Sequence, residues 1–118
     1  MDAVDLWLLR YEPVHNFVAD DLVAGLTEAQ VRGRPVPGVN PIAWLIWHAM
    51  RVEDVCVNRF VLDRGQVLDD GWLARLVVSR RDVGTGMTDA QVDALCDAVD
   101  VEQVRGYCRD ARHERHQQ

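Results

Sequence analysis

The longest regular segment of this sequence constrains its fold more than any other feature. It begins at Asn40-Pro41, where asparagine is a favoured N-cap and proline is favoured at the first helical position. We predict a helix from Pro41 to about Leu62. With a rotation of about 100° per residue, the face that we expect to meet the core contains Ile42, Leu45, Ala49, Val52, Cys56 and Phe60. The opposite face is expected to carry Arg51, Asp54 and Asn58.

The same predicted helix is apolar on more than one side. Ala43, Met50, Val57 and Val61 lie beside the charged stripe. A helix with this pattern is buried centrally or lies at a partner surface. We therefore expect it to pack against at least two neighbours. The outer apolar side chains favour a second copy of the chain as a partner, related by a two-fold axis.

Further helix signals precede and follow this segment. Apolar residues spaced by three and four run from about Val4 to Leu26, and Pro13 within that run predicts either a kink or a helix that begins near Glu12. Gly71 to Arg80 is a candidate short helix. Capping boxes predict three more helix starts, at Thr27 with Gln30, at Thr88 with Gln91 before a helix over 89–98, and at Asp100 with Gln103 before a helix from Val101.

Composition agrees with one all-α domain over residues 1–118. The chain has 48% hydrophobic and 27% charged residues, as expected of a globular domain. Its net charge of −6 without a basic block argues against nucleic acid and anionic membranes as partners. All basic residues are arginine, so a lysine Schiff base and a P-loop lysine are excluded.

The cysteine pattern indicates a reducing compartment. Cys56, Cys96 and Cys108 are odd in number and widely spaced, which supports neither a disulfide framework nor a zinc ribbon. The N-terminal segment lacks a basic region followed by a long apolar core, so we expect no signal peptide and a cytoplasmic protein. Cys56 is expected to be a small buried hydrophobe.

The histidines are the best candidates for chemistry. His48 lies on the predicted core side of the central helix, where it is either a metal ligand or a histidine bonded to a carbonyl or carboxylate. His113 and His116 share a helix face and could chelate an ion, although a charged terminus is more often simply solvated. His15 is expected to be structural. Trp44 and Trp47 are expected to be packing or interface anchors.

Two stretches of sequence resemble a known family. They are residues 26–30 (LTEAQ) and residues 34–48 (RPVPGVNPIAWLIWH), which are followed by Arg51 and by Glu53-Asp54. This pattern resembles the DinB-like (YfiT-like) superfamily of four-helix bundles, and the weaker part of the likeness extends to Tyr107. The resemblance implies an antiparallel helical bundle that often forms a homodimer.

The resemblance also implies a metal site. Many members bind a divalent metal, zinc or nickel, through a histidine that corresponds to His48 and an H-x-x-x-H pair on the final helix. Characterised relatives use low-molecular-weight thiols, as mycothiol-dependent isomerases and bacillithiol transferases do. Here the helix from Val101 resembles the third of the family, so we expect the fourth helix to be lacking, with His113 and His116 one residue short of the pair spacing.

Two functional hypotheses follow. In the first, the chain is a relative of metal-dependent, thiol-linked transferases and isomerases that retains His48 as one ligand. A catalytic zinc ion normally needs three protein ligands, so we expect the monomer not to be an active metalloenzyme. In the alternative, the chain is a non-catalytic helical module that acts through self-association or another protein, and His48 is merely packed.

Overall fold

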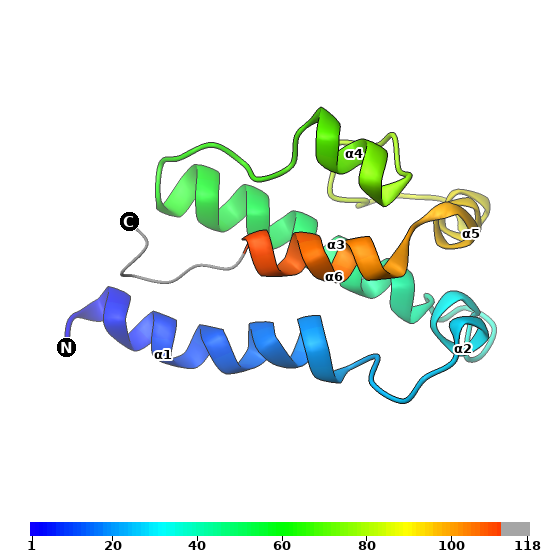
Figure 1. The fold of residues 1–118 in the computed structure, drawn as a ribbon, viewed down its shortest axis with the longest axis horizontal. Helices are drawn as coiled ribbons and strands as arrows, with labels where there is room; N and C mark the ends of the chain where they lie inside the picture. Colours follow the sequence, from blue (N-terminus) through cyan, green and yellow to red (C-terminus); the bar gives the residue numbers. More distant parts are fainter. Residues whose placement is uncertain (112–118) are drawn as a thin grey trace.

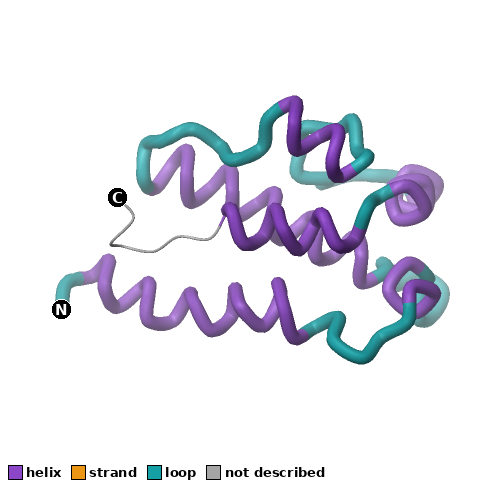
Figure 2. Tube along the Cα trace, viewed as in Figure 1, coloured by secondary structure: helices purple, strands orange, loops and turns teal. Residues whose placement is uncertain are grey.

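The computed structural model describes residues 1–111, which are helical and contain no strand. The predicted all-α class is therefore confirmed, as the helical trace in Figure 2 shows. Two segments, labelled η, are wider helical turns of the π type. In chain order the elements are α1 (Ala3–Asn16), η1 (Phe17–Asp21), α2 (Glu28–Arg32), α3 (Ile42–Glu53), η2 (Asp54–Val61), α4 (Asp70–Leu76), α5 (Asp89–Ala98) and α6 (Val101–Ala111).

Three long rods determine the shape of the molecule, which measures 44 × 29 × 23 Å. In Figure 1 the rods are α1 with η1, α3 with η2, and α6, and α1 runs opposite to the other two. The short helices α2 and α5 lie together at one end. Helix α3 contacts α2, α5 and α6, so the prediction that it packs against at least two neighbours is confirmed.

The capping boxes predicted the starts of α2 and α5 correctly. In α2 the Gln30 amide donates to the Thr27 hydroxyl at 3.1 Å, and in α5 the Gln91 amide donates to Thr88 at 3.2 Å. In each box the glutamine side-chain oxygen accepts a hydrogen bond from the backbone amide of the N-cap threonine in return. Asp100 caps α6 by accepting from the Gln103 amide. These starts follow from local sequence because both partners lie within one turn.

The start of α3 differs from the prediction by one residue. Pro41 is the N-cap itself, and no side chain caps the helix. Asn40 does not act as the cap, because its side-chain oxygen accepts instead from the Arg34 guanidinium at 3.4 Å. The helix therefore begins at Ile42, with the Leu45 amide donating to the Pro41 carbonyl.

The N-terminal helix runs through its proline. Helix α1 begins at Ala3 after a capping box between Asp2 and Asp5, and it includes Pro13. Of the two alternatives, a kink or a start near Glu12, the second was therefore wrong. A proline removes one intrahelical donor, and the backbone changes to the wider π turn soon after it, where the Leu22 amide donates to the Phe17 carbonyl at 2.9 Å.

The predicted orientation of the central helix was wrong. Arg51, Asp54 and Asn58 are fully buried, whereas Leu45 is 43% and Phe60 71% exposed. Cys56 is also exposed, so it is not the buried hydrophobe that we expected. Met50 and Val57 likewise belong to the interior, and of the predicted outer residues Val61 is exposed. The polar stripe could turn inward because its members satisfy one another there.

A strained residue ends α4. Val77 adopts the left-handed conformation, with φ 60° and ψ 39°, which costs a non-glycine residue about 1–2 kcal/mol. Val77→Gly should therefore raise the free energy of unfolding by about 1 kcal/mol, measured by urea denaturation. Val77→Ala retains the Cβ and should give no such gain. Equal stabilisation by both substitutions would contradict the strain explanation.

Within the described residues, no helix is both long enough and apolar enough to cross a bilayer.

Candidate functional site

His48 lies half-buried on α3, and other residues contact both one edge and one face of its imidazole ring. Its Nδ1 atom contacts the backbone carbonyl of Val83. Its face stacks on the Trp44 indole, with ring centroids 4.5 Å apart and an interplanar angle of 13°. Because a carbonyl can only accept, Nδ1 carries the proton and donates it. In the neutral ring, Nε2 then carries the lone pair and is the atom able to bind a metal.

The carbonyl that orients His48 belongs to a segment, residues 81–87, which we call the strap. Within it, Gly84 has a φ of +90°, and a Cβ placed there would lie 2.6 Å from Cζ3 of Trp47. Farther along, Met87 Sδ accepts from the Trp44 indole N–H at 3.4 Å. The strap thus contacts both tryptophans of α3, which are buried anchors as predicted.

Arg51 joins the strap to the interior. Its guanidinium donates to the carbonyls of Arg81 at 2.6 Å and Asp82 at 3.2 Å. The same group donates to Tyr107 Oη on α6 at 3.0 Å and to Gln66 Oε1 at 3.0 Å. One buried cation therefore links α3 to α6 and to two loops.

Asp54 is the carboxylate that forms an ion pair with the Arg51 guanidinium. Its Oδ2 lies 3.4 Å from Nη1 of Arg51 and accepts from the Tyr107 hydroxyl at 2.5 Å. The same carboxylate accepts from the backbone amides of Val67 and Leu68 and from the Asn58 side chain. Burial, followed by the bond to Asp54, raises the pKa of Tyr107 well above its usual range. The phenol therefore remains protonated and can donate.

Sequence reasoning missed this network because it treated Arg51, Asp54 and Asn58 as a solvated stripe. A signal was present. Counted at about 100° per residue, the three polar residues share a face with Trp44 and Trp47, and these aromatic residues are the largest apolar side chains of the helix. Weighting the faces by side-chain size rather than by the number of apolar residues would have indicated the buried side.

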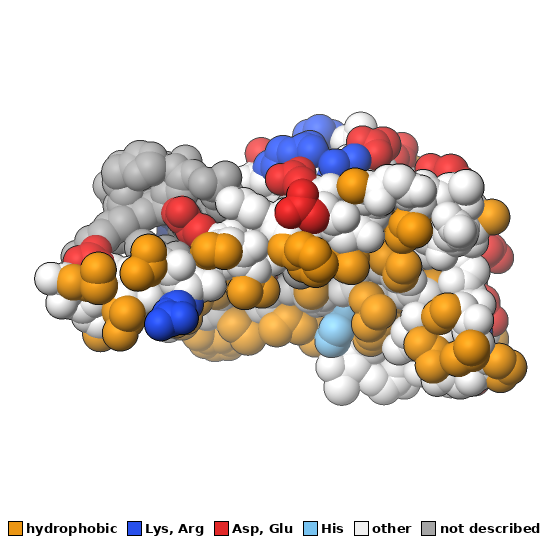
Figure 3. All heavy atoms as spheres, turned by 90° about the horizontal axis from the view of Figure 1, so that it is seen from below, with side chains coloured by type: hydrophobic (Ala, Val, Ile, Leu, Met, Phe, Trp, Pro, Cys, Tyr) orange, Lys and Arg blue, Asp and Glu red, His pale blue; other side chains and the backbone are white. Residues whose placement is uncertain are grey.

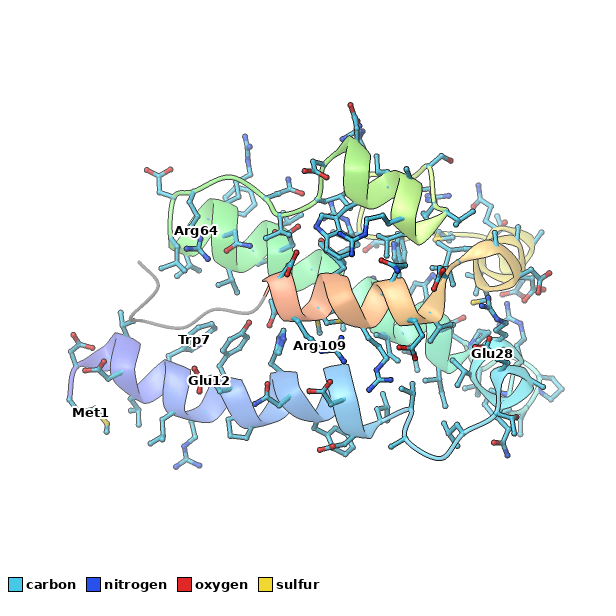
Figure 4. The ribbon with its side chains drawn as sticks, in the orientation of Figure 1. Met1, Trp7, Glu12, Glu28, Arg64 and Arg109 are labelled. Carbon is cyan, nitrogen blue, oxygen red and sulfur yellow. The ribbon has the colours of Figure 1, made fainter. Side chains whose placement is uncertain are left out.

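His15 is buried, and its structural role stays a prediction. Its Nδ1 lies 2.8 Å from Glu53 Oε1, and this pair joins α1 to α3. Among the described residues, His15 Nε2 and Glu53 Oε2 have no hydrogen-bond partner. In Figure 4, Trp7 and Glu12 lie on the side of α1 that faces the other rods. Arg109 of α6 extends toward this side of α1.

The cysteines differ in their surroundings. Cys56 is exposed on η2, while Cys96 and Cys108 are buried, and all three are free thiols. Burial raises the pKa of Cys96 to about 11. Burial also raises the pKa of Cys108 well above its usual range. The two buried thiols are therefore protonated at neutral pH and are poor nucleophiles.

The described residues do not bring a full ligand set to His48. Residues 1–111 contain no group of three or more His, Cys, Asp or Glu side chains that could hold a metal ion. His113 and His116 lie outside the described residues. The site around His48 therefore comprises an imidazole oriented by the Val83 carbonyl, and residues 1–111 do not complete a three-ligand set around it.

Comparison with known proteins decides the family. A family model described as the DinB superfamily matches residues 18–117. The chain belongs to the DinB superfamily. The match extends from η1 through α6 and includes His48, so the resemblance seen in residues 26–30 and 34–48 is confirmed over most of the domain. A search of curated proteins found no match to this DinB-superfamily chain.

Proposed function

We propose that this DinB-superfamily domain binds a divalent cation, zinc or nickel, through Nε2 of His48. The chemistry served would be transfer or isomerisation that uses a low-molecular-weight thiol. The contact between His48 Nδ1 and the Val83 carbonyl carries the proposal. Histidines that bind metals almost always donate their other ring N–H to a carbonyl, carboxylate or water.

The ligands present in residues 1–111 do not by themselves fit a catalytic metal. Such an ion normally takes three protein ligands and one open position, whereas the described residues contain no group of three such side chains. The proposal therefore requires ligands from outside these residues, such as His113 and His116 or a second copy of the chain. The proposal for residues 1–111 is therefore confined to binding of the cation.

Zinc titration of the untagged protein, followed by calorimetry, tests the proposal. His48→Ala should weaken zinc binding by at least about 100-fold, since even outer-shell substitutions cost about 10–100-fold. Cys56→Ala, which removes an exposed thiol from the same rod, should leave the affinity unchanged. A His113→Ala/His116→Ala variant shows whether that pair supplies ligands. Equal zinc affinity in the wild type and His48→Ala would exclude His48 as a ligand.

A second candidate function, self-association, is favoured by exposed apolar side chains on α1 and at the end of η2. Figure 3, viewed from below the molecule, shows hydrophobic side chains along much of the face that α1 forms. Clusters of this kind mark interaction sites. We propose a second copy of the chain as the partner. The exposed apolar residues on α1, η1 and η2 include Leu6, Trp7, Leu9, Val14, Phe17, Phe60 and Val61.

Sedimentation of matched variants tests self-association. Phe60→Asp places a charge on the exposed end of η2 and should convert a dimer at micromolar concentration into a monomer. Val36→Asp alters an exposed valine in the loop after α2 and should leave the dimer intact. We avoid Val57 because it is buried within the chain. A wild-type monomer at tens of micromolar would refute the dimer.

A further inference from the structure

We propose that the strap, residues 81–87, presets the imidazole of His48, and that Arg51 is the positioning residue that fixes the strap. Arg51 does not contact the lone-pair nitrogen of His48. It acts instead through two backbone carbonyls that precede Val83. The significance for metal binding rests on the proposed function, whereas the effect on the tautomer of His48 does not.

The first step is the anchoring of the strap at its N-terminal end. Arg51 donates to the consecutive carbonyls of Arg81 and Asp82, and the next carbonyl, that of Val83, accepts from His48. The guanidinium is itself immobilised, because it is 1% exposed and is bonded to Asp54 and Tyr107. With two carbonyls fixed in sequence, the third has little freedom to turn away from the ring.

The second step is the anchoring of the strap beyond Val83. Gly84 packs so closely on the Trp47 indole that it has no room for a Cβ, and its φ of +90° also favours glycine. Met87 then accepts from Trp44, and Trp44 stacks on the face of His48. The strap therefore controls the imidazole twice, directly at Nδ1 and through Trp44 at the ring face.

The consequence is a fixed tautomer. A histidine free in water favours the proton on Nε2, which would block that atom as a ligand. The Val83 carbonyl places the proton on Nδ1 instead and leaves the Nε2 lone pair available. A ligand held in this way before the metal arrives loses less orientational freedom on binding.

The test is the tautomer of His48, read from side-chain nitrogen-15 NMR spectra of the metal-free full chain. The spectra are recorded at a pH where imidazole is neutral. The wild type should show a proton on Nδ1 of His48. Gly84→Ala and Arg51→Lys should each shift the population toward the Nε2 tautomer. The first displaces the strap from Trp47, and the second replaces the rigid five-donor guanidinium by a single ammonium group.

Gly86→Ala is the matched control. Gly86 also has a positive φ, of +82°, and lies in the strap, but a Cβ there would meet no atom within 4 Å. It should therefore share the backbone strain while retaining the Nδ1 tautomer. Circular dichroism identifies variants that remain folded, and if Arg51→Lys does not fold, Gly84→Ala decides.

The outcomes separate this inference from the proposed function. A wild type with the proton on Nε2 of His48 would overturn the proposal that the strap determines the tautomer. An unchanged tautomer in folded Gly84→Ala would overturn it as well. If zinc binds, its affinity should fall by about tenfold or more in Gly84→Ala, and an equal affinity would overturn the positioning role. If the tautomers behave as expected but the wild type binds no zinc, the role of the strap in fixing the tautomer is supported and the metal proposal fails.

Discussion

Asp54→Ala is expected to lower the free energy of unfolding by about 3–5 kcal/mol, the cost of leaving one partner of a buried ion pair uncompensated. Asp54 is fully buried, and its removal would leave the Arg51 guanidinium without its carboxylate. The amides of Val67 and Leu68 would also lose their acceptor. Urea denaturation of the wild type and the variant measures the difference.

Asp70→Ala is the matched control for that experiment. Asp70 also pairs with an arginine, Arg81, but both side chains are exposed. Surface ion pairs contribute about 0–1 kcal/mol, so this variant should unfold close to the wild type. A loss below about 1 kcal/mol for Asp54→Ala would mean that the buried network does not support the fold.

Trp47→Ala should be similarly destabilising, by about 3–5 kcal/mol, because it removes a buried aromatic side chain and leaves a cavity. Trp47 is fully buried beneath Gly84. The loss should also loosen the strap, since Gly84 would no longer rest on the indole. Thermal and urea unfolding measure the effect on stability.

Trp7→Ala makes the same chemical change at an exposed site. Trp7 lies on α1, 41% exposed and stacked on Tyr11 at 4.5 Å between ring centroids. Its removal should cost about 1 kcal/mol, the range measured for aromatic pairs. Equal losses of stability in the two tryptophan variants would contradict the assignment of Trp47 to the buried core.

Local signals allowed much of the secondary structure to be predicted. The Thr88 and Gln91 box located α5 at residues 89–98 because all the atoms involved belong to one helical turn. The predicted helix from Pro41 to Leu62 corresponds to α3 followed by η2. The change from α to π turns within this segment was not predicted.

The number of apolar residues on each face did not predict the orientation of the central helix, although the size of the Trp44 and Trp47 side chains favoured the buried face. Two faces of the segment are apolar, so the face that is buried depends on the neighbours. Arg51 can be buried because Tyr107 of α6 and the carbonyls of Arg81 and Asp82 accept hydrogen bonds from its guanidinium. None of these partners is adjacent to Arg51 in the sequence.

The candidate site could be predicted only in part for the same reason. The family pattern identified His48, but the Val83 carbonyl that orients it lies 35 positions away along the chain. Every residue type at position 83 carries a backbone carbonyl, so side-chain identity gave no indication of this contact. Gly84 was the one readable signal, and its close approach to Trp47 explains why glycine is needed there.

Anomalous diffraction at the zinc absorption edge tests the central claim most directly. Crystals of the untagged chain grown with zinc should show a peak about 2.0–2.1 Å from Nε2 of His48. Nδ1 should still donate to the Val83 carbonyl. A zinc-containing crystal with no peak at His48, or with the ion on Nδ1 and Val83 displaced, would contradict the account.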